Sequence, residues 1–238
     1  MTRPTRPAPT TIRALVFDVF GTLVDWRAGV ARDVRAAFGK TVGAEAVADA
    51  WRDEYQPTME EVRSGRIAFS KLDVLHRRNL DRVLARLRID ADEPTRVQLN
   101  LAWHRLDAWP DVTPALHKLR PRFLLAPCSN GNISLMADLA RRNGWHWDAV
   151  LGAEVARDYK PKPEVYLTAC AAFDCAPGEV MMVAAHSSDL EAAALAGLRT
   201  AFIARPNEHG PGRGETAPSV AVDFAAPDLG ALASMLLD

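Results

Sequence analysis

The first strong pattern in the chain is a short apolar run, residues 14–17 (ALVF), that ends at Asp18. An apolar run of this length, followed by the turn residues Gly21 and Thr22, predicts a buried central strand of a parallel sheet. Similar runs recur at residues 123–126, 149–151, 180–183, 200–203 and 220–224. They alternate with helical spacing at residues 113–119, 133–142, 163–172, 189–196 and 229–237. This alternation predicts an α/β fold with parallel strands and right-handed crossovers.

Residues 28–109 show a different pattern, in which long stretches of helical spacing replace the short apolar runs. Helices are predicted in this block at about residues 30–38, 45–63, 69–87 and 94–106. Because the block interrupts the alternation directly after the first strand, we expect a helical insertion that covers the strand ends as a lid.

The predicted architecture is a doubly wound, Rossmann-like parallel sheet with an inserted all-helical cap. The core is expected to span residues 12–27 and 110–238, and the cap residues 28–109. Residues 1–11 are rich in Pro, Thr and Arg and are expected to form a disordered tail. The length of 238 residues and the 48% hydrophobic content fit one large globular domain with an inserted part.

Charge and composition exclude several classes of function. The net charge of −1 argues against generic binding of nucleic acids or anionic membranes. No apolar run is long enough to span a bilayer, and the N-terminus lacks the apolar segment of a signal peptide, so we expect a cytoplasmic protein.

Cys128, Cys170 and Cys175 lack metal or redox spacing and are expected to be reduced thiols. Cys128 precedes a serine, but a buried structural thiol is the favoured interpretation.

Several polar residues follow the predicted strands, where open α/β sheets build their sites. Asp18 at the end of the first strand is a candidate nucleophile, and its alternative is a helix-capping or loop aspartate. Ser129 and Asn130 precede a predicted helix, so they either bind an anion with the backbone N–H groups there or only cap the helix. Lys160 lies in a turn stiffened by Pro161, which fixes its direction, although a lone lysine is usually a solvated surface charge.

The segment FDVFGTLVDW, residues 17–26, resembles the first motif of the haloacid dehalogenase superfamily, in the form of its 2-haloacid dehalogenase branch. The resemblance implies that Asp18 attacks the substrate and forms a covalent aspartyl ester, with Thr22 orienting its carboxylate. It also implies that the backbone N–H groups of Val19 and Phe20 help to bind the substrate carboxylate.

Three further motifs follow in the order that the resemblance requires. Ser129 and Asn130 match residues that hold the substrate carboxylate or orient the site. Lys160 matches a lysine that keeps the nucleophile ionised, as an opposite charge nearby should. Tyr166, six residues later, belongs to the same motif and is a candidate substrate-binding residue. Arg52 matches a cap arginine that contacts the departing halide, and its alternative is one solvated arginine among many.

The fourth motif, AAHSSD at residues 184–189, differs from that of the superfamily's metal-dependent phosphatases. The phosphatases carry an acidic metal ligand where Ala184 and Ala185 stand, and a general acid at the position of Phe20. The loss of both acidic functions predicts that no metal or other cofactor is used. Asp189 is the candidate to orient or activate water, or it pairs structurally with Lys160. His186 is a candidate halide donor, and its alternative is a buried histidine satisfied by backbone groups.

The expected activity is hydrolysis of short 2-haloalkanoic acids, such as haloacetate and 2-halopropionate, to 2-hydroxy acids. The partners are then a small haloacid and water, and the resemblance also makes a homodimer plausible. The segments AAHSSDLEAA and RPNEHGP resemble a sub-branch that includes fluoroacetate-cleaving members, which makes defluorination a hypothesis. The alternatives are a phosphatase or phosphotransferase on the same fold and a non-catalytic protein that binds small anions.

Overall fold

The computed structural model describes residues 12–238, so the predicted tail at residues 1–11 lies outside the described part. Within the described residues, a sheet of six parallel strands has the order β3-β2-β1-β4-β5-β6. The strands are β1 (Ala14–Phe17), β2 (Leu124–Ser129), β3 (Leu151–Gly152), β4 (Val180–Ala184), β5 (Arg199–Ile203) and β6 (Phe224–Ala226). β1 pairs with both β2 and β4, which confirms the central parallel strand.

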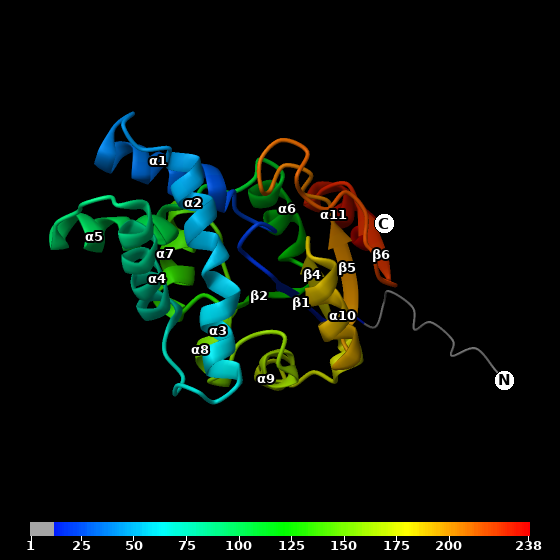
Figure 1. The fold of residues 1–238 in the computed structure, drawn as a ribbon. Helices are drawn as coiled ribbons and strands as arrows, with labels where there is room; N and C mark the ends of the chain where they lie inside the picture. The colour runs from blue at the N-terminus through cyan, green and yellow to red at the C-terminus, as the bar shows by residue number, and fades with distance from the viewer. Residues whose placement is uncertain (1–11) are drawn as a thin grey trace.

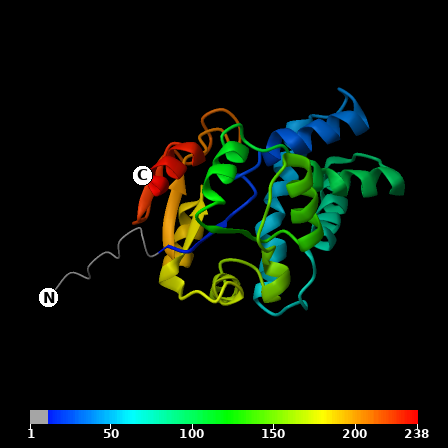
Figure 2. The same cartoon turned by 180° about the vertical axis from the view of Figure 1, so that it is seen from behind.

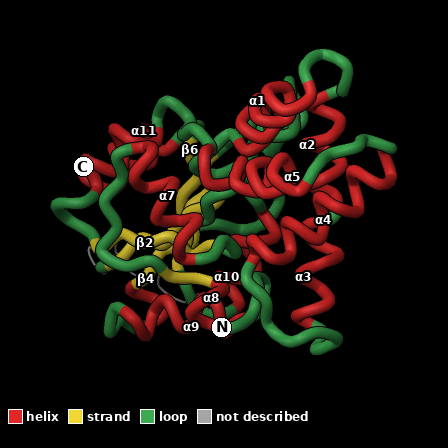
Figure 3. The backbone as a smooth tube through the Cα atoms, turned by 90° about the vertical axis from the view of Figure 1, so that its left-hand side faces the viewer, coloured by secondary structure: helices red, strands yellow, loops and turns green. Residues whose placement is uncertain are grey.

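Helices cover both faces of the sheet. Successive side chains of β1 point to opposite faces, and each set packs against different helices. Leu15 and Phe17 pack in one core cluster with residues of α6 (Val112–Leu119), α7 (Ile133–Asn143) and α11 (Leu229–Leu237). Ala14 and Val16 pack in a second cluster with residues of α9 (Pro163–Ala172) and α10 (Ser187–Leu195). Figure 3 shows the strands between helices, so the predicted doubly wound α/β class is confirmed.

An all-helical segment lies between β1 and α6, and we call its members the cap helices. They are α1 (Trp26–Phe38), α2 (Ala44–Asp53), α3 (Tyr55–Arg63), α4 (Leu72–Leu87), α5 (Glu93–Asn100) and the 3₁₀ helix η2 (Leu101–Arg105). Helices α1 to α5 gather at one side of the molecule, and β5, β6 and α11 form the opposite side (Figures 1 and 2). The boundaries of the core at residues 12–27 and 110–238, and of the cap at 28–109, stay predictions.

The structure divides two helices that the sequence pattern predicts as continuous. The helix predicted at 45–63 is α2 followed by α3, which meet at Glu54. Pro57 in the first turn of α3 has no N–H to donate to the carbonyl of Asp53, so a continuous helix is interrupted there. The helix predicted at 94–106 changes from α5 into η2 at Leu101.

Other differences lie at short elements. β6 is formed by Phe224–Ala226 and not by residues 220–224. Ladder pairing with β5 starts only where Phe224 lies opposite Ala201. A four-residue helix, α8 (Ala153–Ala156), directly follows β3 and is too short to give a periodic signal.

The three cysteines agree with the prediction of reduced thiols. Cys128, Cys170 and Cys175 are free and buried, and burial raises the pKa of Cys128 to about 12. Cys128 is therefore an unreactive structural thiol. In the described part of the chain no helix combines the length and the apolar character that crossing a membrane requires.

The parallel topology brings the ends of β1, β2 and β4 to one edge of the sheet. Asp18 follows β1, Ser129 ends β2 and Ala185 follows β4. Thr22 connects two of these segments, because the backbone N–H of Ala185 donates to its Oγ1 at 3.0 Å. The chemistry-bearing motifs therefore meet where adjacent central strands end.

We expect the substitution Gly152→Ala to destabilise the fold by about 1–3 kcal/mol. Gly152 has φ of +119°, and a Cβ there would overlap the carbonyl oxygen of Ser129 on the neighbouring strand. Urea denaturation of the variant checks this, with Gly178→Ala as control, because no atom lies near a Cβ at position 178. Equal stability of the two variants would contradict this packing of β3 against β2.

Candidate active site

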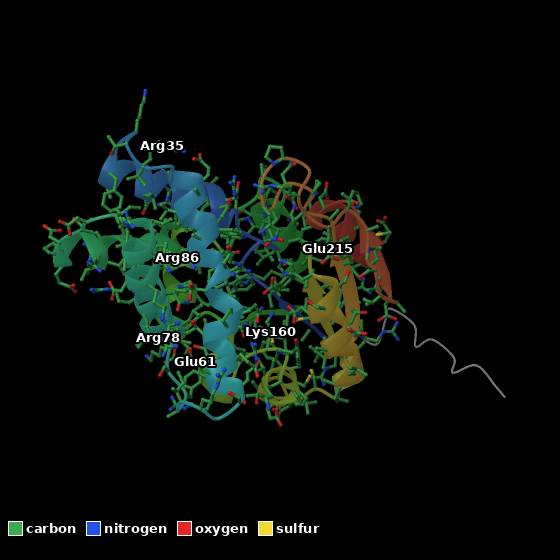
Figure 4. All side chains as sticks on the ribbon, in the orientation of Figure 1. Arg35, Glu61, Arg78, Arg86, Lys160 and Glu215 are labelled. Carbon is green, nitrogen blue, oxygen red and sulfur yellow. The ribbon has the colours of Figure 1, made fainter. Side chains whose placement is uncertain are left out.

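A cavity of about 940 Å³ lies between the cap helices and the strand ends. The core contributes Asp18, Lys160 and Asp189 to its wall, and the cap contributes Arg52 and other side chains. Lys160 lies between the cap helix α3 and the core helix α10 (Figure 4). The cavity therefore combines groups from the parts of the chain before and after the helical insertion.

The carboxylate of Asp18 is nearly fully buried and has a different environment at each oxygen. Oδ1 accepts a hydrogen bond from Lys160 Nζ at 2.9 Å. Oδ2 accepts one from Thr22 Oγ1 at 2.7 Å and lies 3.2 Å from Nδ1 of His186. Burial raises the pKa of Asp18, but the charges of Lys160 and His186 and the hydrogen bonds from His186 and Thr22 together lower it well below its ordinary value. Asp18 is therefore ionised, as a nucleophile must be.

Lys160 joins two carboxylates in the cavity wall. Its Nζ donates to Asp189 Oδ2 at 2.5 Å as well as to Asp18. Burial lowers the pKa of Lys160, but the charges of Asp18 and Asp189 raise it above its ordinary value. The backbone N–H of Lys160 donates to Asn130 Oδ1 at 2.9 Å. Asn130 therefore fixes the position of the turn that carries Lys160.

Asp189 has hydrogen-bond partners at both oxygens. Tyr166 Oη donates to Oδ1 at 2.5 Å, and Lys160 occupies Oδ2. Burial and the neighbouring Asp189 charge raise the pKa of Tyr166, so its hydroxyl keeps the proton that it donates. Asp189 thus pairs with Lys160 in the structure, and both its structural role and its function toward water stay predictions.

His186 lies between two carboxylates. Its Nδ1 faces Asp18, and its Nε2 lies 2.8 Å from Glu208 Oε2. Burial lowers the pKa of His186, but hydrogen bonds to Asp18 and Glu208 and their charges raise it to about 10. The expected contact of His186 with a halide stays a prediction, and its contacts here are with the two carboxylates.

Arg52 brings a positive charge from α2 to the cavity. Its guanidinium carbon lies 4.1 Å from the centre of the Tyr55 ring and 5.3 Å from that of Trp26. Among the described residues, its buried Nη1 has no hydrogen-bond partner. A buried N–H group of a cation without an acceptor is ready to bind an anion.

The remaining predicted residues divide between the cavity wall and its support. Phe20, Asn130 and Tyr166 line the cavity, whereas Thr22, Val19 and Ser129 do not. Val19 is fully buried, and Ser129 Oγ accepts a hydrogen bond from the Gly131 backbone N–H at 3.0 Å. The predicted parts of Val19, Phe20, Ser129 and Tyr166 in substrate binding stay predictions.

Three residues of the site escape reasoning from the sequence. Tyr55 and Arg63 line the cavity from α3, and Glu208 lines it from the segment after β5. Arg63 Nη1 donates to the Lys160 carbonyl at 2.9 Å, which joins α3 to the core. Tyr55 and Arg63 can be assigned to the site only once the position of α3 over the strand ends is known. Glu208 lies in the segment RPNEHGP, whose loop composition and resemblance to a sub-branch do not by themselves assign a role to this residue.

Comparison with known proteins identifies the family. Residues 12–197 match the model of haloacid dehalogenase-like hydrolases, so the chain belongs to that family. It is 30% identical over 202 residues to (S)-2-haloacid dehalogenase 1 of Pseudomonas sp. (strain CBS-3). The aligned region covers 83% of this chain and 86% of that relative.

Solved structures give the same result at higher identity. A defluorinating L-2-haloacid dehalogenase superposes with a TM-score of 0.92 and is 45% identical, with 95% of this chain and 96% of that chain covered. The L-2-haloacid dehalogenase from Xanthobacter autotrophicus with chloropropionic acid covalently bound superposes with a TM-score of 0.81 at 26% identity, covering 94% of this chain and 98% of that one. The predicted family resemblance is confirmed.

The raised pKa of His186 predicts a loss of stability in alkaline solution. The folded-state pKa of His186 is about 10, above the ordinary value of 6.5. Protonated His186 therefore stabilises the fold, and this stabilisation is fully present below pH 6.5. That stabilisation is lost as the pH rises toward 10, with a slope equal to about one proton. Free energies of unfolding measured from pH 6.5 to 10 check this, because His186→Asn should lack this part of the slope. Parallel curves for parent and variant would contradict a charged His186.

Proposed function

We propose that this protein hydrolyses short 2-haloalkanoic acids, including haloacetates and 2-halopropionates, to 2-hydroxy acids through an ester on Asp18. The observation that carries this proposal is the pairing of two groups in one cavity. Asp18 on the core side is a buried, ionised carboxylate, and Arg52 on the cap side is a half-buried cation whose buried Nη1 has no partner among the described residues. Displacement of a halide needs a nucleophile on one side of the carbon and an anion acceptor on the other.

The first step uses Asp18 Oδ1 as the attacking atom. Oδ2 accepts a hydrogen bond from Thr22 and faces His186, whereas within residues 12–238 Lys160 is the one hydrogen-bond donor to Oδ1. Oδ1 forms a bond to C2 of the substrate, and the C–halogen bond breaks with its electron pair leaving on the halide. Arg52 Nη1 donates to the departing anion. Attack from behind the C–halogen bond inverts the configuration at a chiral C2.

The second step regenerates the enzyme. Water attacks Cγ of the Asp18 ester, and the bond from Cγ to the substrate oxygen breaks. One proton of the water reaches the leaving 2-hydroxy acid oxygen, and the other dissociates from the Asp18 carboxyl group. Asp189, already held by Lys160 and Tyr166, is the group that orients the water.

Phosphoryl transfer is the less favoured chemistry. Ala184 and Ala185 supply no oxygen ligand for Mg²⁺, and Phe20 cannot protonate a leaving alkoxide. Phe20 packs edge-on against Trp103 with ring centres 5.6 Å apart, so its position is filled by an apolar wall. A halide needs no proton to leave, and the lack of an acid at this position is compatible with dehalogenation.

Fluoroacetate belongs to the proposed substrate range. The 45% identical relative described above is a defluorinating enzyme by its name. Fluoride accepts hydrogen bonds strongly, and a desolvated guanidinium is the donor that suits it. A homodimer and a cytoplasmic location remain expectations from the sequence.

Halide release in the presence of EDTA tests the proposal. We expect release from chloroacetate and fluoroacetate by the parent and at least a ~10³-fold loss in Asp18→Asn, because the nucleophile is removed. Asp90→Asn, an exposed carboxylate outside the cavity, is the matched control and should keep parental rates. Binding of haloacids without any halide release, or Mg²⁺-dependent release of phosphate from esters, would sink the proposal.

A further inference from the structure

The carboxylate of Glu208 is buried against the site although it lies in a loop. Its side chain is 4% exposed, and it lies on the segment between β5 and β6. Oε2 lies 2.8 Å from His186 Nε2, and Oε1 accepts a hydrogen bond from Trp26 Nε1 at 3.1 Å. Burial of a carboxylate is costly unless charged partners surround it, so this position requires an explanation.

The turn after the nucleophile leaves space for this carboxylate. Gly21 has φ of +85°, and a Cβ at Gly21 would overlap Oε1 of Glu208. Gly21 therefore serves two purposes, because only glycine combines this backbone conformation with such close approach. The Glu208 carboxylate thus lies against Gly21 of the first motif and contacts Trp26 of α1 and His186 of the fourth motif.

The geometry around His186 defines its protonation state. Both ring nitrogens face carboxylate oxygens, Nδ1 that of Asp18 and Nε2 that of Glu208. A neutral imidazole has a single N–H and would place a lone pair against one of these oxygens. Two facing carboxylates therefore favour the doubly protonated imidazolium over the neutral ring. Neither ring nitrogen is left free to bind a halide.

The atom that His186 contacts on Asp18 is the one that develops charge in the second step. Oδ1 carries the substrate in the proposed ester, so Oδ2 is the ester carbonyl oxygen. Attack of water on Cγ moves the carbonyl π pair onto Oδ2, where Thr22 Oγ1 and His186 Nδ1 converge. A hydroxyl that donates to this oxygen and a cationic ring 3.2 Å from it form an arrangement that lowers the barrier of such a step.

We propose that Glu208 is a positioning residue for hydrolysis of the Asp18 ester: it holds His186 as an imidazolium whose Nδ1–H stabilises the oxyanion on Oδ2. The proposal deepens the proposed function and rests on it. When the tetrahedral adduct collapses, the pair on Oδ2 re-forms the carbonyl and the substrate oxygen leaves with a proton from the attacking water. His186 donates a hydrogen bond throughout and transfers no proton.

The two steps are affected differently by this arrangement. In the first step Asp18 loses negative charge, so a cation at Oδ2 gives no advantage there. In the second step charge returns to Oδ2, and the cation stabilises it. Loss of Glu208 should therefore slow ester hydrolysis and spare ester formation, whereas a merely structural contact through Trp26 would affect both steps alike.

Rapid-quench kinetics with chloroacetate test this difference. In Glu208→Gln we expect a chloride burst of one equivalent per site at a rate within about 3-fold of the parent, followed by ester hydrolysis at least about 10-fold slower. The ester should accumulate on the peptide that contains Asp18, where mass spectrometry detects one added carboxymethyl group. A slowed burst, or an unchanged second step, would overturn the proposal.

A double-mutant cycle with His186→Asn separates action through His186 from a general loss of structure. If Glu208 acts through His186, then Glu208→Gln should cause no further slowing of hydrolysis in the His186→Asn background. Additive effects would contradict the proposal. Should Glu208→Gln fail to fold, His186→Asn alone must show the same accumulation of ester.

The structural control is Asp111→Asn. Asp111 pairs with Arg205, three residues before Glu208, at 2.9 and 2.8 Å, and it does not contact His186. This variant should lower the Tm without accumulating ester, and accumulation there would refute a specific effect of Glu208.

A second measurement does not need turnover. Nitrogen NMR of the His186 ring at pH 8 should show two protonated nitrogens in the parent and one in Glu208→Gln. A neutral ring in the parent would overturn the proposal. A parent that holds the imidazolium but releases no halide from any haloacid would instead refute the proposed function.

Discussion

The site depends on one buried ion network, in which the Lys160 ammonium group contacts two carboxylates. Lys160 Nζ lies 2.9 Å from Asp18 and 2.5 Å from Asp189, and all three side chains are at most 10% exposed. Removing one partner of a buried network leaves an uncompensated charge at a cost of about 3–5 kcal/mol. The network joins the end of β1, the turn before α9 and the first turn of α10, so the fold around the nucleophile forms as a unit.

The cap completes this network by contacts that cross from the helical insertion to the core. Arg63 at the end of α3 donates to the Lys160 carbonyl at 2.9 Å. His104 in η2 lies between Asp73 of α4 and Asp138 of α7, at 3.0 and 2.8 Å. These contacts hold the Arg52 side of the cavity over the nucleophile. Asp18 and Lys160 are 7% and 6% exposed, so their charges act more strongly on one another than they would in water.

The strength of the local signal decides what can be predicted from the sequence. The central strand and the nucleophile Asp18 share one apolar run followed by a turn, so both can be recognised from adjacent residues. Lys160 and Asp189 lie in compact motifs that follow Asp18 along the chain in the order that the family resemblance requires. Glu208 cannot be recognised in this way, because its partner His186 lies 22 residues earlier in the chain and β5 lies between them.

Helix boundaries show the same limit on a smaller scale. The apolar spacing of residues 45–63 continues across Glu54, so periodicity alone does not reveal that α2 ends there. The interruption depends on Pro57, whose missing N–H affects a residue four positions earlier. The break matters for the site, because α2 presents Arg52 and α3 presents Tyr55 to one cavity.

The central claim is that Asp18 carries the substrate as an ester and that water attacks the Asp18 carbonyl carbon. A single turnover with excess enzyme in ¹⁸O-labelled water tests it most directly. We expect the label in the peptide that contains Asp18 and an unlabelled hydroxyl group in the product. Label in the product hydroxyl after one turnover, with none in Asp18, would show direct attack of water on the substrate and would contradict the account.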